Sequence, residues 1–508
     1  MTDPQPPAAA RPLPGGLAAF LVFFSSGAVL VLETVSLRLV GPYVGVTLQV
    51  TSSVIGVALG AIAYGAWFGG WLADRRDPRG LIAPALVLAA IVTAVTLPAV
   101  RYAGELLRGG AASGILLLTG LAVFLPAALL AAVTPLVVKL QLGDLRRTGQ
   151  VVGRLSSIGT LGGITATLGT GFVLVAALPS SVILIGLSVL LGVTGIVLGG
   201  YLRRQEQIVV PGRGRTRAVV AVVGLAGASL STVAPTPCDV ETAYHCAAVV
   251  ADPDNPDGRL LLLNSAHHSY VDLADPTHLD FAYTQWIGAV ADVAAPAGAR
   301  LDALHLGGGG FTMPRYLTAT RPGTRNVVYE IDGGLVELAR RELGARPGPD
   351  LQPMVGDARV LVGQMPDRSV DLVVGDAFGH LVVPWHLATR EMLAQIRRVT
   401  RPGGLYVQNV IDYPPLRFIR AELATVAAEF PHLALVAPTA ALAGEEGSNF
   451  VVVASDAPIP LEPLAARLAE TADKPVTVLS GPALDDFIGT APVLTDDFAP
   501  VDQLLATG

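Results

Sequence analysis

The sequence contains few charged residues, and this scarcity limits the kinds of protein that it can encode. Of its 508 residues only 15% are charged, against roughly 25% in an average soluble domain. Hydrophobic residues make up 52% of the chain. Because a surface in contact with water needs polar side chains, this composition excludes a protein that is soluble over its whole length. It predicts a part that lies in a membrane.

Basic residues and cysteines are scarce as well. The 34 Lys and Arg are outnumbered by 41 Asp and Glu, which gives a formal net charge of -7. A protein that binds nucleic acid usually presents an excess of basic side chains, so we expect no nucleic-acid partner. The sequence has only two cysteines, and we expect no metal cofactor.

Long apolar runs fill the N-terminal half of the sequence. A chain of 508 residues exceeds the size at which one core stops growing, so at least two domains are expected. We interpret residues 1–16 as a disordered tail and residues 17–235 as a transmembrane domain of about seven helices. The runs cover 17–40, 50–73, 81–100, 113–138, 151–178, 181–202 and 218–235.

Small residues and Arg residues add detail to this membrane domain. Gly56 and Gly60, and then Gly65 and Gly69, recur at four-residue spacing, which favours close packing of helices. Lys and Arg gather in the loops after the second, fourth and sixth runs, which predicts that these loops are cytoplasmic. Seven spans then place the N-terminus in the cytoplasm and the C-terminal domain outside, in a multi-pass protein of the cell membrane.

The C-terminal half changes to short apolar strands that alternate with amphipathic helices. This rhythm is typical of an α/β domain with a parallel sheet covered on both faces. We expect a small β-rich part over residues 237–300 and a Rossmann-like, methyltransferase-type domain over residues 301–508. The strands expected in these two parts are 247–250, 260–263, 301–306, 326–329, 370–374, 405–409 and 449–454.

A glycine-rich loop follows the first strand of the Rossmann-like domain. Gly307, Gly308 and Gly309 would let the backbone approach a nucleotide, and Glu330 ends the next strand about twenty residues later. An acid at that position can accept hydrogen bonds from both ribose hydroxyls. The alternative, a tight strand-to-helix turn beside a solvent-facing acid, stays open.

Two further acids follow later strands. Asp357, with Ala358, comes where a carboxylate can bond an adenine amino group, although it can equally cap a helix N-terminus. Asp376 follows the strand 370–374, at the carboxyl edge of the sheet where ligands of open α/β sheets bind.

Several of these segments together resemble the spermidine synthases, the polyamine aminopropyltransferases, and specifically the bacterial form fused to an N-terminal multi-pass membrane domain. The resemblance spans essentially the whole chain. It is carried by the residues 241–244, 264–283, 307–310, 330–332, 356–358, 376–378 and 494–500.

The resemblance implies aminopropyl transfer from decarboxylated S-adenosylmethionine to a small-molecule amine or polyamine. It implies that Glu330 holds the ribose and Asp357 the adenine, and that Asp376 holds the reacting amine. His268 and Tyr283 fall near the substrate-side positions of the family.

The chain departs from the family pattern at two glycines. Gly310 and Gly379 stand where the family has acids that bind cationic amines. The two cysteines, Cys238 and Cys246, follow the last apolar run, and in an oxidising compartment they would form a disulfide; two buried free thiols are the alternative.

Three functions therefore stay open. The first is a membrane-bound spermidine synthase-like transferase. The second is a methyltransferase that uses S-adenosylmethionine itself, and the third is a domain that only binds a polyamine or nucleoside on a transporter-like membrane bundle. The lipid bilayer is a partner in all three, and homo-oligomers are compatible with each.

Overall fold

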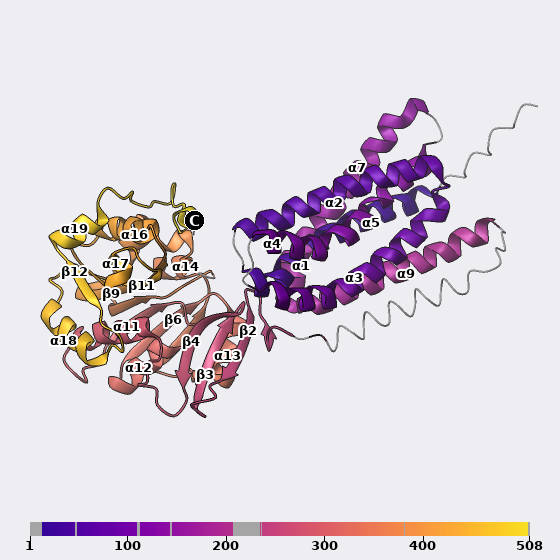
Figure 1. The fold of residues 1–508 in the computed structure, drawn as a ribbon. Coiled ribbons are helices and arrows are strands. Elements are labelled where there is room, and N and C mark those ends of the chain that lie inside the picture. Colours follow the sequence, from indigo (N-terminus) through magenta and orange to yellow (C-terminus); the bar gives the residue numbers. More distant parts are fainter. Residues whose placement is uncertain are drawn as a thin grey trace, which may run out of the picture. The chain divides into compact units, whose positions relative to one another are not determined.

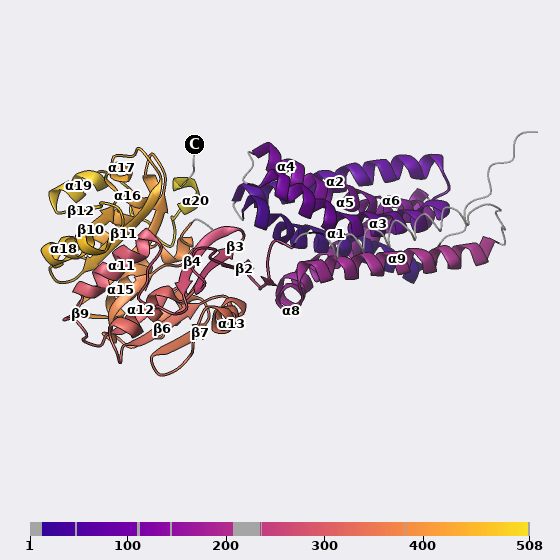
Figure 2. The same cartoon turned by 60° about the horizontal axis from the view of Figure 1, so that its bottom comes forward.

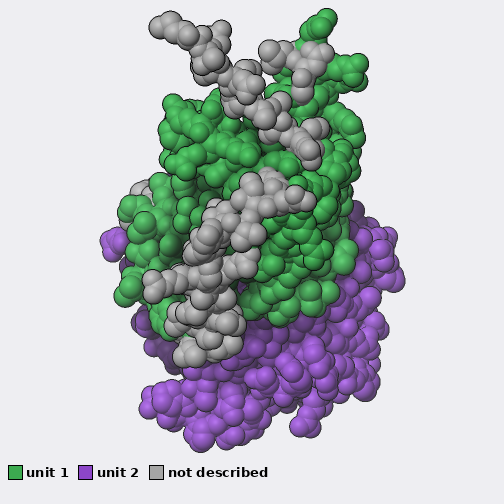
Figure 3. All heavy atoms as spheres, turned by 90° about the vertical axis from the view of Figure 1, so that its right-hand side faces the viewer, with its two compact units in different colours: residues 1–237 green, residues 238–508 purple. Residues whose placement is uncertain are grey.

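The fold was determined as a computed structural model. It describes residues 13–45, 48–108, 112–142, 145–206, 234, 236–379 and 382–505. The chain divides into two compact units, Met1–Pro237 and Cys238–Gly508 (Figure 3). Each unit is described by itself below.

The described part of unit 1 has six helical segments that are long and apolar enough to cross a membrane. The expected seventh run, 218–235, lies outside the described residues except for Ala234. The single helices are α1 (Gly15–Val44), α2 (Leu48–Arg75), α3 (Arg79–Leu107) and α9 (Ser180–Glu206). The fourth segment consists of α4 (Ala112–Thr119), η1 (Gly120–Phe124), α5 (Leu125–Ala131) and α6 (Val133–Gln141). After the short helix η2 (Leu145–Arg147), the fifth segment consists of α7 (Thr148–Gly169), η3 (Thr170–Leu174) and α8 (Val175–Ala177).

Small side chains let these helices pack closely. α1 packs along α7, α3 along α9, and α2 against α5. A side chain at Gly65 would overlap the backbone of Ala128 in α5, and one at Gly69 would meet Cα of Ala132 at 2.7 Å. Gly56 and Gly60 of the same helix have no neighbour within 4 Å of a built Cβ among the described residues, so within this part of the chain the second pair of glycines serves the close helix contact.

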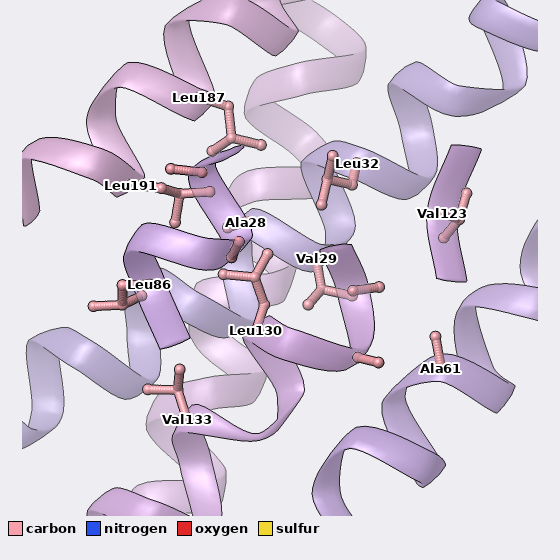
Figure 4. Close-up of a cluster of buried hydrophobic side chains, with 14 of the residues drawn as sticks. Ala28, Val29, Leu32, Ala61, Leu86, Val123, Leu130, Val133, Leu187 and Leu191 are labelled. Carbon is pink, nitrogen blue, oxygen red and sulfur yellow. The ribbon is translucent and has the colours of Figure 1, made fainter. Parts of the chain in front are cut away.

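Branched aliphatic side chains fill the interior of unit 1. Figure 4 shows side chains of α1, α3, α5, α6 and α9 gathered around Leu32 and Leu130, both of which are fully buried. Burial of this kind among helices supplies the van der Waals packing that holds membrane helices together.

Unit 2 contains two sheets. β1 (Val240–Glu241), β2 (Cys246–Ala251), β3 (Gly258–Leu263) and β4 (Ala266–Asp272) form an antiparallel sheet in that order. The second sheet has eight strands in the order β12-β10-β11-β9-β8-β5-β6-β7. These strands are β5 (Asp302–Leu306), β6 (Arg325–Glu330), β7 (Leu351–Val355), β8 (Val370–Gly375), β9 (Thr400–Asp412), β10 (His432–Ala437), β11 (Ser448–Ser455) and β12 (Thr477–Ser480).

Helices cover both faces of the eight-stranded sheet, as Figures 1 and 2 show. One face packs against α14 (Ala358–Gly363), α15 (Arg390–Val399), α16 (Arg417–Ala427) and α19 (Pro482–Ile488), and the other against α11 (Ala282–Val293), α12 (Thr312–Thr320) and α18 (Leu461–Thr471). The remaining helical turns are α13 (Gly333–Glu342), η4 (Trp385–Leu387), α17 (Thr439–Leu442) and α20 (Val501–Leu504). Central strands such as β8 are buried on both faces, which explains their continuous runs of Leu and Val.

The fold class expected from the sequence, a helical membrane domain followed by a Rossmann-like domain with a small β layer, is confirmed. One detail is corrected, because the sheet is mixed and not wholly parallel. The pairs among β9, β8, β5, β6 and β7 are parallel, whereas the pairs β9–β11, β11–β10 and β10–β12 are antiparallel. β5 lies between β6 and β8, so the chain order of the strands reverses there. In open α/β sheets this reversal opens a crevice at the carboxyl ends of the strands.

Candidate active site

A cavity of about 480 Å³ lies at this reversal point in unit 2. Its walls come from β4 and the start of α11 on one side, and from the loops after β5 and β8 on the other, with β9 and β11 contributing polar side chains. Among the residues singled out from the sequence, the cavity is lined by Gly307, Gly308, Gly309, His268, Tyr283 and Asp376. Glu330, Asp357 and Ala358 are not among the residues that line it.

The glycine loop passes directly against the loop that carries Asp376. Gly307 has φ +94° and Gly309 has φ +50°, conformations that favour glycine. A side chain at Gly307 would also overlap the Asp376 carbonyl group. The loop ends at Phe311, which is fully buried although its φ is +60°. Glycine is therefore required at Gly307 both by conformation and by space.

Gly310 is enclosed by β4. Its N–H donates to Oγ of Ser269 at 2.9 Å. A Cβ at Gly310 would lie 2.7 Å from Cβ of Ser269 and 3.1 Å from Cγ2 of Val271. The acid that the family has at this position therefore does not fit this backbone. At Gly379, by contrast, the nearest atom to a built Cβ is 3.9 Å away.

Glu330 ends β6 and ties the glycine loop to the next loop. Its Oε2 accepts from the N–H of Gly308 at 2.8 Å and of Gly309 at 3.4 Å. Its Oε1 accepts from the N–H of Asp332 at 2.9 Å. The side chain is buried, so the alternative of a solvent-facing acid does not describe it.

Asp357 is the N-cap of α14. Its Oδ1 accepts from the N–H of Arg359 at 2.8 Å, and its Oδ2 lies 3.4 Å from Nε2 of His386. The capping interpretation offered by the sequence is thus realised. Ala358 is the first residue of α14. The N–H of Gly356 donates to the Glu330 carbonyl at 2.9 Å, so the ends of β6 and β7 lie side by side at one edge of the sheet.

Asp376 stands at the centre of a chain of hydrogen bonds. Its Oδ1 accepts from Nδ2 of Asn409 at 2.9 Å, and its Oδ2 accepts from the Tyr283 hydroxyl at 3.2 Å. Asn409 is oriented in turn by Asn449, whose Nδ2 donates to its Oδ1 at 2.9 Å. The carboxyl group is therefore held in one orientation by two side chains from separate elements, and a third side chain orients one of them.

The environment of Asp376 changes its acidity. Burial raises its pKa to about 6, against the lowering effect of the hydrogen bonds from Asn409 and Tyr283. Burial and the nearby Asp376 carboxylate raise the pKa of Tyr283 well above 10, so that the phenol stays a hydrogen-bond donor. A carboxylate with a pKa near 6 is ionised at neutral pH yet basic enough to take up a proton.

Three histidines also line the cavity, among them His267 of β4. His268 extends from β4. His305, in β5, is buried with Nε2 2.9 Å from Oδ1 of Asn326, and burial lowers its pKa to about 4. His305 is accordingly neutral at physiological pH and contributes no charge to the cavity.

The sequence analysis did not single out Ser269, Asn409 or Asn449 as site residues. Asn409 and Asn449 are amides within otherwise apolar strands, and this was the signal available in the sequence. A buried polar residue in a central strand needs a partner, and here the partner is the Asp376 carboxyl group.

The two cysteines form a disulfide bond at the start of unit 2. It joins Cys238 to Cys246, the first residue of β2, and closes a loop that contains β1. The alternative of two free thiols therefore does not hold in this structure.

Comparisons with known proteins found a matching family model and several similar proteins. Residues 304–408 match a family model described as a methyltransferase domain. A polyamine aminopropyltransferase from Vibrio vulnificus is 26% identical over 213 residues, which cover 40% of this chain and 69% of that protein. A probable spermidine synthase from Corynebacterium glutamicum is similar at 28% identity and a TM-score of 0.49, covering 52% of this chain and 97% of that one. A spermidine synthase from Thermotoga maritima gives 15% identity and a TM-score of 0.34 over 48% of this chain and 80% of that one.

Proposed function

We propose that this chain, a membrane-fused transferase of the polyamine aminopropyltransferase family, moves an aminopropyl group from decarboxylated S-adenosylmethionine to an amine or polyamine acceptor in the cavity of unit 2. The observation that carries the proposal is the Asp376 carboxyl group, fixed by Tyr283 and Asn409 at the point where the strand order reverses.

In the proposed reaction the acceptor nitrogen attacks the carbon beside the donor sulfonium. A new C–N bond forms while the C–S bond breaks, and the leaving group is the neutral thioether methylthioadenosine. The attacking amine must be neutral, so one proton has to leave the nitrogen. Asp376 can accept that proton, because its pKa of about 6 leaves it ionised at neutral pH.

Tyr283 and Asn409 would keep the Asp376 carboxylate aimed at the acceptor. Both donate hydrogen bonds to it, one to each oxygen, and neither takes up the proton itself. Each carboxylate oxygen retains a further lone pair for an ammonium or amine N–H. Orientation of this kind lowers the entropic cost of bringing the acceptor to the donor carbon.

The nucleoside part of the donor would lie along the edge formed by the ends of β5, β6 and β7. The glycine loop leaves room for close approach, and the buried Glu330 carboxylate still has acceptor capacity on Oε1 for ribose hydroxyls. Asp357 would accept from the adenine amino group through Oδ2, because Oδ1 is engaged in capping α14.

Methyl transfer from S-adenosylmethionine is a second candidate, and one observation favours it. Ser269 and Val271 leave no room for an acid at Gly310, so the site lacks the carboxylate that pairs with a cationic aminopropyl tail in the family pattern. The match of residues 304–408 to a methyltransferase domain is compatible with this reaction.

The product distinguishes the two reactions. The purified full-length protein in detergent is incubated with decarboxylated S-adenosylmethionine or S-adenosylmethionine and a panel of diamines and polyamines, and the nucleosides are identified by mass spectrometry. Methylthioadenosine that forms only when an amine is present supports aminopropyl transfer, whereas S-adenosylhomocysteine supports methyl transfer. Nucleoside binding with neither product would leave the binding-domain function.

A further inference from the structure

A loop closed by the disulfide contacts the edge of the sheet that is proposed to hold the ribose. The loop runs from Cys238 to Cys246 and contains β1, which pairs with β2 through Val240 and Ala247. Within it the N–H of Thr242 donates to the His245 carbonyl at 2.8 Å, and the N–H of His245 donates back to Oγ1 of Thr242 at 2.8 Å. The loop is thus a compact unit held by its own hydrogen bonds and by a covalent bond.

Thr242 and His245 both reach the same oxygen of Asp332. The Thr242 hydroxyl donates to Oδ2 of Asp332, and Nδ1 of His245 lies 3.0 Å from that oxygen. Asp332 has no exposed surface, and its other oxygen caps α13 by accepting from the N–H of Gly334 at 3.0 Å. Burial would raise the pKa of Asp332, but the hydrogen bonds from His245 and Thr242 outweigh it and hold the pKa below the usual value.

Asp332 in turn contacts Glu330. Its backbone N–H donates to Oε1 of Glu330 at 2.9 Å, while Oε2 of Glu330 accepts from Gly308. An unbroken series of contacts therefore leads from the disulfide loop through Asp332 to Glu330 and the glycine loop. Nothing in the proposed reaction uses Thr242, His245 or the disulfide directly, so their arrangement needs another explanation.

We propose that Thr242 and His245 are positioning residues that fix Glu330 through Asp332, and that the Cys238–Cys246 disulfide keeps them in place. The inference rests on the proposed function, because it assigns Glu330 to the ribose. Reduction of the disulfide frees the loop to sample other conformations. Glu330 then loses its fixed orientation, and affinity falls selectively for ligands that carry ribose hydroxyls.

Two ligands and a conservative pair of variants test the positioning role in the full-length protein in detergent. Affinities are measured by calorimetry for methylthioadenosine and for its 2′,3′-dideoxy analogue, which has no ribose hydroxyls to bond. Thr242→Val, which keeps the shape and removes the hydroxyl, is expected to weaken methylthioadenosine roughly tenfold and the analogue less than about twofold. Thr242→Ser is expected to bind as the wild type does.

The disulfide is tested in the same way and does not depend on the folding of a variant. Addition of reductant to the wild type should reproduce the selective loss, and Glu330→Gln should show no further change on reduction. Equal losses for both ligands, or no loss with Thr242→Val and with reductant, would overturn the positioning role and leave the proposed function intact. A wild type that binds neither nucleoside would overturn both.

Discussion

The two units treat buried polar groups differently. Among the described residues of unit 1, the hydroxyls that form hydrogen bonds mostly do so within their own helix: Thr34 donates to the Leu30 carbonyl and Thr96 to the Val92 carbonyl. Other buried hydroxyls there, such as that of Thr93, have no hydrogen-bond partner in the described part of the chain. In unit 2, buried polar side chains bond to residues far away in the chain, as Asp376 does with Asn409. A hydroxyl that bonds its own helix needs no partner elsewhere, whereas a long-range polar network fixes side chains in one geometry.

This difference indicates where chemistry takes place. The helix contacts of unit 1 depend on small residues such as Gly65 and on aliphatic packing, which hold helices together without orienting a reactive group. The network of unit 2 brings a carboxyl group, a phenol and two amides to one cavity. We therefore expect substitutions in unit 1 to change stability and substitutions in the cavity to change rate or affinity.

The largest expected effect is all-or-none and concerns the side of the membrane on which unit 2 lies. Positive loops and the seven spans expected from the sequence, of which six lie among the described residues, predict that unit 2 is extracytoplasmic, where the disulfide would persist. An impermeant maleimide applied to intact cells should then label the protein only after reductant is added. Cys238 should react first, because Cys246 is only 7% exposed.

A variant without cysteines is the control for the labelling experiment. The chain has only two cysteines, so a Cys238→Ser, Cys246→Ser double variant should give no signal. Labelling that needs permeabilised cells but no reductant would place unit 2 in the cytoplasm. The predicted sidedness would then be wrong.

Asp376→Asn should have the next largest effect, on rate. Removal of the proton acceptor is expected to lower kcat on the order of 10²–10⁴-fold. The affinity for methylthioadenosine should stay near the wild-type value, because the nucleoside edge is formed by other residues. A variant that is folded and keeps near-full activity in the product assay would contradict the assigned role.

Asp376→Asn should lower the rate but raise the stability of unit 2. The pKa of Asp376 is raised to about 6 in the folded protein, so the charged carboxylate destabilises the fold above pH 6, and this penalty disappears as the pH falls toward 3.8. Asp376→Asn should therefore raise the unfolding free energy of unit 2 by about 1–2 kcal/mol at pH 8, after allowance for partial solvent screening, and by less at pH 5. Wild-type activity should decline below pH 6, where the carboxylate is protonated.

Much of this architecture could be predicted from the sequence, because its signals are local. Apolar runs indicate membrane helices, and runs of Val and Leu indicate central strands such as β8. Glu330 and Asp376 could be assigned to the carboxyl edge because each directly follows or ends such a strand. β7 was not predicted as a strand. It contains Pro353, which is tolerated because β7 is an edge strand that pairs only with β6.

The features that could not be predicted from the sequence depend on contacts between distant segments. Asn409 and Asn449 face the cavity only because β9 and β11 pair antiparallel in the register that sets Asn449 against Ile411. No local pattern specifies that pairing. The enclosure of Gly310 by Ser269 likewise depends on how the four-stranded sheet packs against the glycine loop, and the sequence alone showed only that an acid was absent.

A substitution at the tightest helix contact tests the role of unit 1. Gly65→Leu would drive a side chain into the backbone of Ala128, so we expect a loss of about 3 kcal/mol or more from overpacking. Gly60→Leu is the matched control, because its Cβ meets no atom within 4 Å. Thermal unfolding followed by size-exclusion chromatography in detergent should show a lower transition temperature for Gly65→Leu only. Similar behaviour of the two variants would contradict the contact.

Nucleoside binding by both leucine variants should match the wild type below their unfolding temperatures, since the cavity is formed wholly within unit 2. A folded Gly65→Leu protein that had lost nucleoside affinity would show that the two units are functionally coupled. The expectation that substitutions in unit 1 change stability alone would then be wrong.

The last expected effect is that of Glu330→Gln on nucleoside affinity. The carboxylate accepts from the backbone N–H groups of Gly308 and Asp332 on different oxygens, and an amide can replace only one of those oxygens as an acceptor. The NH₂ group of the new Gln would face a backbone N–H, which is also a donor, so one of these two hydrogen bonds is lost. The side chain then holds both the ribose and the glycine loop less firmly. We expect methylthioadenosine affinity, measured by calorimetry, to fall about 10- to 100-fold, or about 1.4–2.7 kcal/mol.

Glu337→Gln on α13 is the control. The exposed Glu337 carboxylate bonds only Arg340 among the described residues, so this variant should bind methylthioadenosine as the wild type does. If folded Glu330→Gln binds as tightly as this control, Glu330 has no part in the site, and the nucleoside must bind elsewhere in unit 2.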